Sequence, residues 1–266
     1  MNTAASGRNN SASLRRALSI LTHFETDQGD GFTVSELSDA LDINKSTVSR
    51  LIRPLVSYHF LEEGERAGSY RLGWQNANLG QRYLTHVRAD RDMHQVLLNL
   101  SQRTRETVHL VRATPPQVVY IDKIDSPHAV RMFSRVGNTQ PMHCTSVGKS
   151  ILAFSSEERL RAVIATGLPP RTSATITSAD DLRAELAVIR ERGWAMDNVE
   201  NEEGIRCVAA PIFDFDGDCD FALSVSGPVA RITYEKAFQI APTVIEAANE
   251  ISRRLGARVP QRRAAL

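Results

Sequence analysis

Residues 33–56 read TVSELSDALDINKSTVSRLIRPLV, and this pattern predicts two short helices joined by a tight turn. Thr33 and Glu36 have the spacing of a capping box, in which each side chain accepts a hydrogen bond from the other residue's backbone N–H. Asp42 and Ile43 fit the turn, and Asn44 is a suitable N-cap for the second helix. The segment is therefore predicted to form a helix-turn-helix.

The second of these helices carries basic and hydroxyl side chains and no acidic one. Its apolar residues recur with helical spacing, which predicts one buried side and leaves the polar side free. Hydroxyl and guanidinium groups suit DNA phosphates, and arginine can also bind guanine through two hydrogen bonds. The predicted DNA contacts are Lys45, Ser46, Thr47, Ser49, Arg50 and Arg53. An ordinary helical hairpin with a solvated charged side is the alternative.

The flanking residues extend this segment to a winged helix over residues 12–74. Upstream, apolar residues between Leu14 and Phe24 recur with helical spacing and predict a third helix. Downstream, the short apolar runs 60–61 and 70–72 enclose a polar turn, which is the pattern of a β-hairpin. Arg66 lies in that turn and is a further candidate for a phosphate contact, although three neighbouring glutamates disfavour DNA there.

Composition limits how this protein could bind DNA. Its formal net charge is +1, so affinity must come from the local basic cluster and from more than one copy of it. The three cysteines are widely spaced and indicate a reducing, cytoplasmic environment rather than a disulfide framework. No apolar run approaches the roughly 18 residues of a membrane span, and the polar N-terminus lacks the apolar core of a signal peptide. Residues 1–11 and 258–266 are predicted to be disordered tails.

The remaining sequence predicts a linker helix over residues 75–89 and an α+β domain over residues 90–257, built on an antiparallel sheet. Along this domain the apolar residues change from helical spacing to strand-like runs and back. The predicted strands are 107–111, 118–121, 129–136, 204–213 and 221–226. The predicted helices are 90–105, 146–154, 156–166, 180–192 and 234–255.

Enzyme-like motifs in this domain are incomplete. Residues 147–150, VGKS, resemble the end of a phosphate-binding loop, but His143 stands where the first glycine of that loop belongs. Residues 214–218, DFDGD, resemble a calcium loop whose glycine comes too early. A zinc site formed by His143, Cys144, Asp197 and Cys207 would lack the short ligand spacing that zinc sites usually have. The sequence alone nevertheless leaves open whether Cys144 and Cys207 bind a metal. We therefore predict no catalytic residue, no resident metal and no cofactor.

A binding pocket is better supported than catalysis. The loop 141–145 leads into a predicted helix, and the free N–H groups near Ser146 and Val147 at its start suit an anion such as a carboxylate. Ser224 and Ser226 are two apart on a predicted strand, so both face the same side of the sheet. Buried hydroxyl groups need hydrogen-bond partners, which a ligand could supply. The alternative is that the two serines bond to each other or to the backbone.

Together these motifs resemble those of IclR-family transcriptional regulators, and the resemblance covers residues 14–255. It is carried by short motifs in a specific order and spacing. They are Tyr70-Arg71-Leu72-Gly73, Pro141-Met142-His143, Gly148-Lys149, Arg192-Gly193-Trp194-Ala195, the segment 197–204, the segment 206–211 and Ser224-Val225-Ser226-Gly227-Pro228.

The resemblance implies a winged helix-turn-helix joined by a linker helix to a GAF-like α/β effector-binding domain. It also implies a cytoplasmic homodimer or dimer of dimers that binds a double-stranded DNA operator and a small organic acid, in some members an aromatic one. The family's ligand positions fall here on Met132, Gln140, Ser146, Val147, Asp197, Ile205, Cys207, Ser224 and Ser226. Gln140, Ser146 and Val147 depart from the residues common in the family and imply a narrower, more polar pocket. An ionised Asp197 facing the ligand would repel a carboxylate and suit a hydroxyl or an amine.

The sequence hypothesis is a ligand-responsive repressor or activator, in which the effector favours one arrangement of the dimer and so changes the spacing of the two recognition helices. One alternative is a DNA-binding protein whose sensor pocket is vestigial. The other is an enzyme or small-molecule carrier whose basic helix is incidental.

Overall fold

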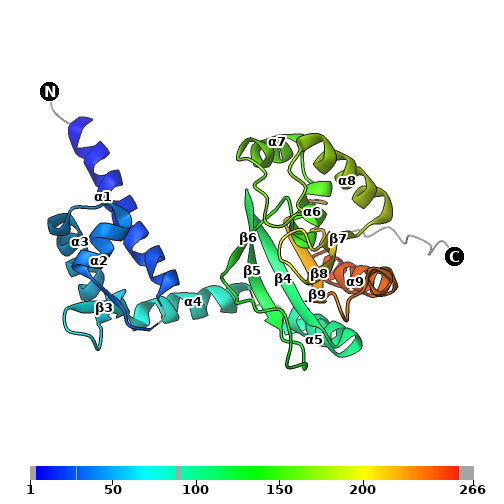
Figure 1. Ribbon diagram of the computed structural model, residues 1–266, viewed down its shortest axis with the longest axis horizontal. Coiled ribbons are helices and arrows are strands. Elements are labelled where there is room, and N and C mark those ends of the chain that lie inside the picture. The colour runs from blue at the N-terminus through cyan, green and yellow to red at the C-terminus, as the bar shows by residue number, and fades with distance from the viewer. Residues whose placement is uncertain (1–3, 28, 88–90, 258–266) are drawn as a thin grey trace. The chain divides into compact units, whose positions relative to one another are not determined.

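The computed structural model describes residues 4–27, 29–87 and 91–257 (Figure 1). The chain divides into two compact units, Met1–His86 and Val87–Leu266. The boundary falls inside the linker helix that the sequence predicts over residues 75–89. Among the described residues, no helix is both long and apolar enough to cross a membrane.

The first unit consists of three helices followed by a β-hairpin. Its elements are α1 (Ala4–His23), the 3-10 turn η1 (Phe24–Thr26), β1 (Phe32–Thr33), α2 (Val34–Leu41), α3 (Lys45–Ser57), β2 (Leu61–Glu63) and β3 (Ser69–Leu72). The three strands form an antiparallel sheet in the order β1-β3-β2. A single apolar core, which includes Ile20, Leu37, Val48 and Ile52, joins the three helices. The winged helix predicted from the sequence is therefore confirmed.

The ends of α2 and α3 are fixed by the side chains that the sequence predicts. The Thr33 hydroxyl accepts the Glu36 N–H at 3.3 Å, and the Glu36 carboxylate accepts the Thr33 N–H at 2.7 Å. Asp42 ends α2 in the left-handed region with a φ of 52°. Asn44 then caps α3 by accepting the Ser46 N–H at 2.9 Å. These local bonds set the direction in which α3 leaves the turn.

Two helices follow the hairpin, and one prediction about the N-terminus needs correction. α4 spans Trp74–Val87 and α5 spans Arg91–Thr104. The structure places residues 4–11 in α1, where the composition predicts a disordered tail. Gly7, Asn9 and Asn10 disfavour a helix there, but the segment has no proline to interrupt one and starts with Ala4 and Ala5, which have high helix propensity. Residues 1–3 and the predicted tail 258–266 lie outside the described residues.

The second unit is built on a six-stranded antiparallel sheet in the order β6-β5-β4-β9-β8-β7. The strands are β4 (Thr107–Thr114), β5 (Gln117–Ile124), β6 (Thr139–Pro141), β7 (Ala195–Asn198), β8 (Ile205–Ile212) and β9 (Phe221–Pro228). β4 lies beside β9 although more than a hundred residues separate them in the sequence, which places both at the centre of the sheet. The α+β class and the antiparallel sheet agree with the sequence prediction.

Helices cover both faces of this sheet (Figure 1). On one face lie α5 and α9 (Tyr234–Arg254), over a core that includes Leu110, Val208, Leu223 and Val244. On the other face lie α6 (Ser146–Ala153), α7 (Glu157–Ala165) and α8 (Ala179–Arg192), over a second core. All eight residues of α6 are buried. The start of α6 therefore meets the sheet inside the molecule, on the face that carries Ser224 and Ser226.

The strand predicted over residues 129–136 is wrong, because this segment is an irregular loop and the strand β6 follows it at Thr139–Pro141. Burial alternates only from Arg131 to Arg135, where Met132 and Ser134 are buried, and Val130 breaks the pattern because it is exposed. The segment nevertheless has no ladder of backbone hydrogen bonds. Side chains hold it against the sheet instead: the Lys123 ammonium donates to the Ser134 carbonyl at 2.8 Å.

Candidate functional site

The face of α3 opposite the core is polar and accessible. Val48, Leu51 and Ile52 are buried, so α3 cannot turn this face inward. Of the predicted DNA contacts, Lys45, Ser46, Arg50 and Arg53 are exposed, and Thr47 and Ser49 are half-buried. Within the described part of the chain, no carboxylate pairs with Lys45, Arg50 or Arg53. These three cations are therefore available to a DNA phosphate or base.

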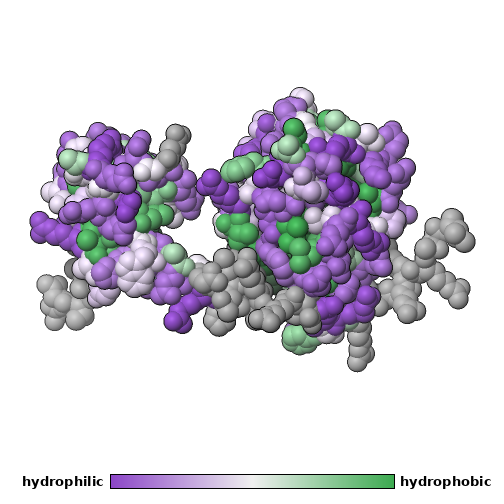
Figure 2. Space-filling model, turned by 90° about the horizontal axis from the view of Figure 1, so that it is seen from below, coloured by the Kyte–Doolittle hydropathy of each residue, from purple (hydrophilic) through white to green (hydrophobic). Residues whose placement is uncertain are grey.

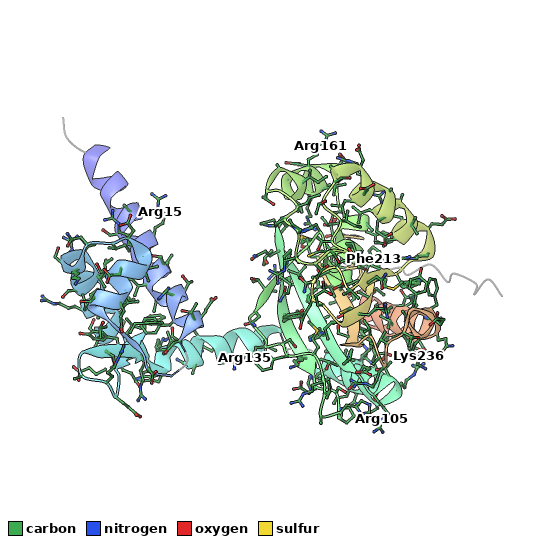
Figure 3. The ribbon with its side chains drawn as sticks, in the orientation of Figure 1. Arg15, Arg105, Arg135, Arg161, Phe213 and Lys236 are labelled. Atoms are coloured by element: carbon green, nitrogen blue, oxygen red, sulfur yellow. The ribbon has the colours of Figure 1, made fainter. Side chains whose placement is uncertain are left out.

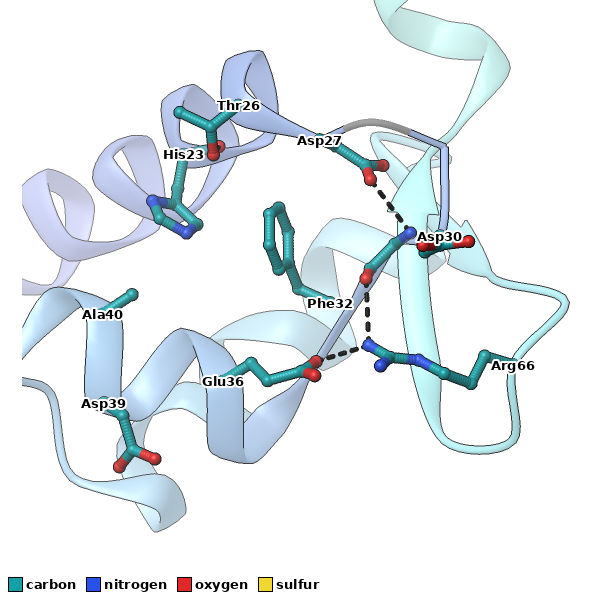
Figure 4. A pocket seen from close by; sticks show the side chains of 10 residues that line it. His23, Thr26, Asp27, Asp30, Phe32, Glu36, Asp39, Ala40 and Arg66 are labelled. Atoms are coloured by element: carbon teal, nitrogen blue, oxygen red, sulfur yellow. Dashed lines mark hydrogen bonds and ion pairs between the residues drawn. The ribbon is translucent and has the colours of Figure 1, made fainter.

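Arg66 is held by its own unit rather than left free. Its guanidinium donates to the Glu36 carboxylate at 2.6 Å and to the Gly31 carbonyl at 3.1 Å (Figure 4). Together with the Thr33 N–H, it lowers the pKa of the Glu36 carboxyl. Glu36 and Arg66 border an open groove between the end of α1 and α2. Asp27, Asp30 and Asp39 also line this groove. Four carboxylates make this groove unsuitable for a phosphate, so we leave Arg66 out of the DNA interface proposed below.

In the second unit, sheet register brings three of the predicted effector contacts into one row. Asp197 on β7 is directly opposite Cys207 on β8, and Cys207 is directly opposite Ser226 on β9. Ser224 lies in the next row, and Ile205 precedes Cys207 by two residues, so both face the same side as the row. Asp197, Cys207, Ser224 and Ser226 are at most 6% exposed. Four predicted residues thus form one buried polar patch beneath α6.

His109 on β4 completes this patch, and no local pattern in the sequence indicates its place there. Register places it opposite Ser224. One ring nitrogen, Nε2, lies 2.7 Å from the Ser134 hydroxyl, and the other, Nδ1, lies 3.4 Å from the Ser226 hydroxyl. Its ring also packs on Tyr120 with centroids 4.6 Å apart. Complete burial, with a smaller contribution from Lys123, lowers the pKa of His109 to about 3, so the imidazole is neutral.

The start of α6 faces this patch. Thr145 is its N-cap and accepts the Gly148 N–H at 3.1 Å. Ser146 and Val147 occupy the first two helical positions, whose N–H groups have no acceptor within a helix. Both residues are at most 3% exposed. Buried N–H groups at a helix start, together with the positive end of the helix dipole, form a favourable environment for an anion.

A tight turn after β7 connects this patch to α6. The Asp197 carboxylate accepts the N–H of Glu200 at 2.7 Å and that of Asn201 at 3.3 Å. The Glu200 carboxylate forms a buried ion pair with Lys149 of α6. Burial, reinforced by the Glu200 charge, raises the pKa of Asp197 to about 7. Burial also raises the pKa of Glu200, despite the opposing effect of Lys149.

The other predicted effector contacts lie around this patch at different depths. Met132 is 4% exposed and belongs to the loop that His109 holds through Ser134. Gln140 is half-buried on β6, opposite Val118, at the far edge of the sheet from β7 and β8. Register therefore does not place Gln140 in the row of Asp197, Cys207 and Ser226.

The protonation of Cys144 and Cys207 does not support the zinc site considered in the sequence analysis. Burial raises the pKa of Cys144 to about 12 and that of Cys207 well above its usual range. A metal binds the thiolate, and burial keeps both thiols protonated in the metal-free protein. Within the described ranges, no three His, Cys, Asp or Glu side chains meet in a way that could hold a metal ion. The Cys144 thiol instead donates to the side-chain oxygen Oδ1 of Asn201 at 3.6 Å.

Comparison with known protein families gives matches to both units. Residues 13–64 match the family model described as the IclR helix-turn-helix domain. Residues 81–253 match the one described as the bacterial transcriptional regulator IclR C-terminal domain. The HTH-type transcriptional regulator KdgR of Dickeya chrysanthemi is 34% identical over 84% of this chain and 73% of its own length. The transcriptional repressor IclR of Escherichia coli K12 is 31% identical over 90% of this chain and 88% of its own.

Solved structures agree with these matches. The crystal structure of the Thermotoga maritima IclR protein is 35% identical, covers 92% of this chain and 99% of its own, and has a TM-score of 0.71. An IclR homologue from Microbacterium hydrocarbonoxydans, crystallised in complex with 4-hydroxybenzoate, is 26% identical over the same shares of the two chains, with a TM-score of 0.76. The similarity therefore extends over both units.

Proposed function

This chain belongs to the IclR family of bacterial DNA-binding transcriptional regulators, and we propose that it represses or activates transcription in response to a small organic acid bound in its second unit. The buried patch of Ser224, Ser226 and His109 beneath the start of α6 is the observation that supports the sensing role most strongly. The unpaired cations of α3 support the DNA-binding role.

For DNA, we propose that α3 enters the major groove and that Lys45, Arg50 and Arg53 contact phosphates or base edges. Ser46, Thr47 and Ser49 lie near the start of α3, where the recognition helix of a helix-turn-helix usually meets the bases. Three cations give only a modest electrostatic attraction to DNA, which favours binding by two or more copies.

We expect Arg50→Ala together with Arg53→Ala to weaken specific DNA binding by about a hundredfold or more, since two basic contacts are lost in each copy. The salt dependence of binding should also become shallower. The measurement is a fluorescence-anisotropy titration, at several salt concentrations, of a duplex that the wild-type protein enriches from a random DNA pool.

The matched control is Arg161→Ala together with Lys236→Ala. Both side chains are exposed on the second unit, where Figure 3 shows Arg161 on the outer side of α7. This control removes the same formal charge and should leave DNA affinity close to that of the wild type. Equal affinity of both double variants for the selected duplex would contradict the role proposed for α3.

For the effector, we propose that N–H groups at the start of α6 and the hydroxyls of Ser224 and Ser226 hold its acid group. Met132 and Val147 are buried apolar residues that would form the wall around its carbon skeleton. A related protein was crystallised with 4-hydroxybenzoate, an aromatic acid. Here the polar patch also includes His109 and Ser134, which favours a compact acid that carries further hydrogen-bonding groups.

We expect Ser224→Ala together with Ser226→Ala to abolish stabilisation by acids while DNA binding persists. A ligand that binds only the folded state raises its melting temperature, so the test is a thermal-shift screen with 4-hydroxybenzoate, pyruvate and a wider panel of carboxylic acids. Ser101→Ala is a suitable control, because Ser101 is a buried serine on α5, on the opposite face of the sheet. An unchanged shift in the double variant would show that the effector binds elsewhere.

We also propose a homodimer or dimer of dimers, with contacts between the DNA-binding units. Leu14 and Leu18 lie one turn apart on α1 and are 60% and 52% exposed. Figure 2 shows hydrophobic residues, in green, on the surface of both units. An exposed apolar stripe on a helix is typical of a surface that pairs with another helix. An effector that prefers one arrangement of the copies would change the spacing of their α3 helices.

The same screen separates this proposal from a regulator with a vestigial pocket. A vestigial pocket would show no acid-dependent shift, although DNA binding would remain sensitive to Arg50→Ala with Arg53→Ala. An enzyme or carrier with an incidental basic helix would show the opposite result, with ligand binding but no selected DNA duplex.

A further inference from the structure

The effector site contains two buried carboxyl groups and one cation that is already paired. Asp197 is 3% exposed and Glu200 is 6% exposed. Lys149, 1% exposed, pairs with one oxygen of Glu200. The other Glu200 oxygen, Oε2, is buried without any hydrogen-bond partner in the described structure. If both carboxyls were ionised, the patch would carry net negative charge before any acid entered it.

The other basic groups near the patch cannot balance a carboxylate. His109 is neutral because its burial is complete. Lys123 pairs with Asp125 at 2.8 Å and also donates to the Ser134 carbonyl. The helix start at Ser146 and Val147 supplies only about half a positive charge. An anionic effector would therefore add a full negative charge to a site where none of the described residues supplies a buried, unpaired cation.

Among the described residues, the buried ionisable groups around Asp197 are acids, neutral groups or, in the case of Lys149, a cation that is already paired. The ionisable groups that interact with it are Glu200 of its own loop, Lys149 of α6, Cys207 of β8, Tyr120 of β5 and Cys144 before α6, and Glu202 acts on Tyr120 and Cys207. Burial raises the pKa of the phenol and of both thiols, so these three groups stay neutral. Arg171 influences Cys144 and is itself exposed.

We propose that the effector binds together with one proton, which Asp197 takes up, so that a neutral carboxyl faces the bound carboxylate. This inference rests on the organic-acid sensor proposed above. The protonated Asp197 carboxyl donates a hydrogen bond to the effector carboxylate, so the two acid groups attract each other. The repulsion that an ionised Asp197 would exert on an acid is thereby removed. The Asp197 oxygen that accepts the Glu200 N–H can keep this bond in either protonation state.

The sign of the pH dependence follows from linkage. The pKa of Asp197 is about 7 before binding, and an adjacent carboxylate raises it further. Above pH 7 the free site loses its proton while the occupied site retains it. Binding then takes up to one proton from solution, and the apparent Kd rises by up to about tenfold per pH unit. Below pH 7 the site is already protonated, so the Kd changes little there.

The test is calorimetric titration of the full-length protein with 4-hydroxybenzoate, pyruvate and acetate between about pH 6.5 and 8.5, where all three carboxylates stay ionised. Each titration is run in phosphate and in Tris, which release different heats when they give up a proton. We expect a Kd that rises above pH 7 and a binding heat that differs between the buffers. Asp197→Asn mimics the protonated carboxyl, so it should bind with a flat pH profile and equal heats.

The neutral amide of 4-hydroxybenzoate provides a second control, because its binding to the wild type should not take up a proton. A flat pH profile for the wild type, or the same slope in Asp197→Asn, would overturn the proton-linked inference and leave the acid sensor intact. If no acid binds at any pH and the wider screen gives no thermal shift, both proposals are wrong. The buffer comparison on the wild type alone decides the question if Asp197→Asn does not fold.

Discussion

Replacing Glu200 by alanine is expected to destabilise the second unit by about 3–5 kcal/mol, because it leaves the Lys149 ammonium buried without its main carboxylate. The side chains of Lys149 and Glu200 are 1% and 8% exposed. The nearest remaining acid, Glu185, is 4.0 Å from the ammonium and already pairs with Arg192. Water cannot readily replace the lost partner at this depth, so the desolvation of Lys149 is no longer balanced.

Loss of Glu200 should also loosen the turn after β7. Val199 lies in the left-handed region with a φ of 64°, which is unfavourable for a β-branched residue. Hydroxyls hold the turn: Thr172 donates to the Val199 carbonyl and Thr175 to the Glu200 carbonyl, each at 2.6 Å. The Lys149–Glu200 pair connects the same turn to α6. We therefore expect the alanine variant to lose affinity for the effector as well as stability.

The measurement is urea unfolding followed by the fluorescence of Trp194, in a background where Trp74, the only other tryptophan, is replaced by phenylalanine. Glu200→Leu combined with Lys149→Met removes both charges and should recover much of the loss. Glu157→Ala, which breaks exposed pairs with Arg161 and Arg183, should have a far smaller effect. If Glu200→Ala unfolds at the same urea concentration as Glu157→Ala, the buried pair does not stabilise this unit.

The sequence predicts the DNA-binding unit well because its signals are local. The bonds between Thr33 and Glu36 join residues three apart, and the Asn44 cap joins residues two apart. Such bonds depend on the order of neighbouring residues and on helix geometry, both of which can be read along the chain. The partner of Arg66 is different: Glu36 lies thirty residues away, and only the packed hairpin brings the two together.

The effector site is predictable only in part, because its geometry depends on register between distant strands. Alternation along one strand places Ser224 and Ser226 on the same face, but it cannot show that His109 lies opposite Ser224. An irregularity in the pairing of β4 with β5 after Leu110 shifts the register further, and no local pattern indicates it. Lys149 gives the clearest case. The sequence presents it within an incomplete phosphate-binding motif, whereas its partner Glu200 is fifty-one residues away.

The failed strand prediction has a related cause. Residues 131–135 alternate between exposed and buried side chains, as an edge strand would, while His109 and Lys123 both hold one residue, Ser134, against the sheet. Alternation reports which side chains are buried but says nothing about backbone pairing. A segment held by side chains can therefore show strand periodicity without being a strand.

Gly148→Ala is expected to destabilise the second unit by about 3 kcal/mol or more and to abolish acid binding. A Cβ atom at this position would lie 2.3 Å from both the Cα and the carbonyl oxygen of Met142. These are backbone atoms, so no side-chain rotation can relieve the overlap. The start of α6 or the loop before it must move, although both are fully buried. Such a movement displaces the N–H groups of Ser146 and Val147 from the place proposed for the carboxylate.

The glycine at position 80 supplies a matched control for this substitution. It lies in the exposed part of α4, and a Cβ there would meet nothing within 4 Å. Gly80→Ala should therefore stabilise the protein by about 0.5–1 kcal/mol, since alanine favours the helix more than glycine does. Thermal unfolding with and without 4-hydroxybenzoate measures both effects. If Gly148→Ala melts no earlier than the wild type and still responds to the acids that stabilise the wild type, close packing of α6 against Met142 does not shape the effector site. If only the acid response is lost, α6 has moved at little energetic cost, and the site is more sensitive to its position than the fold is.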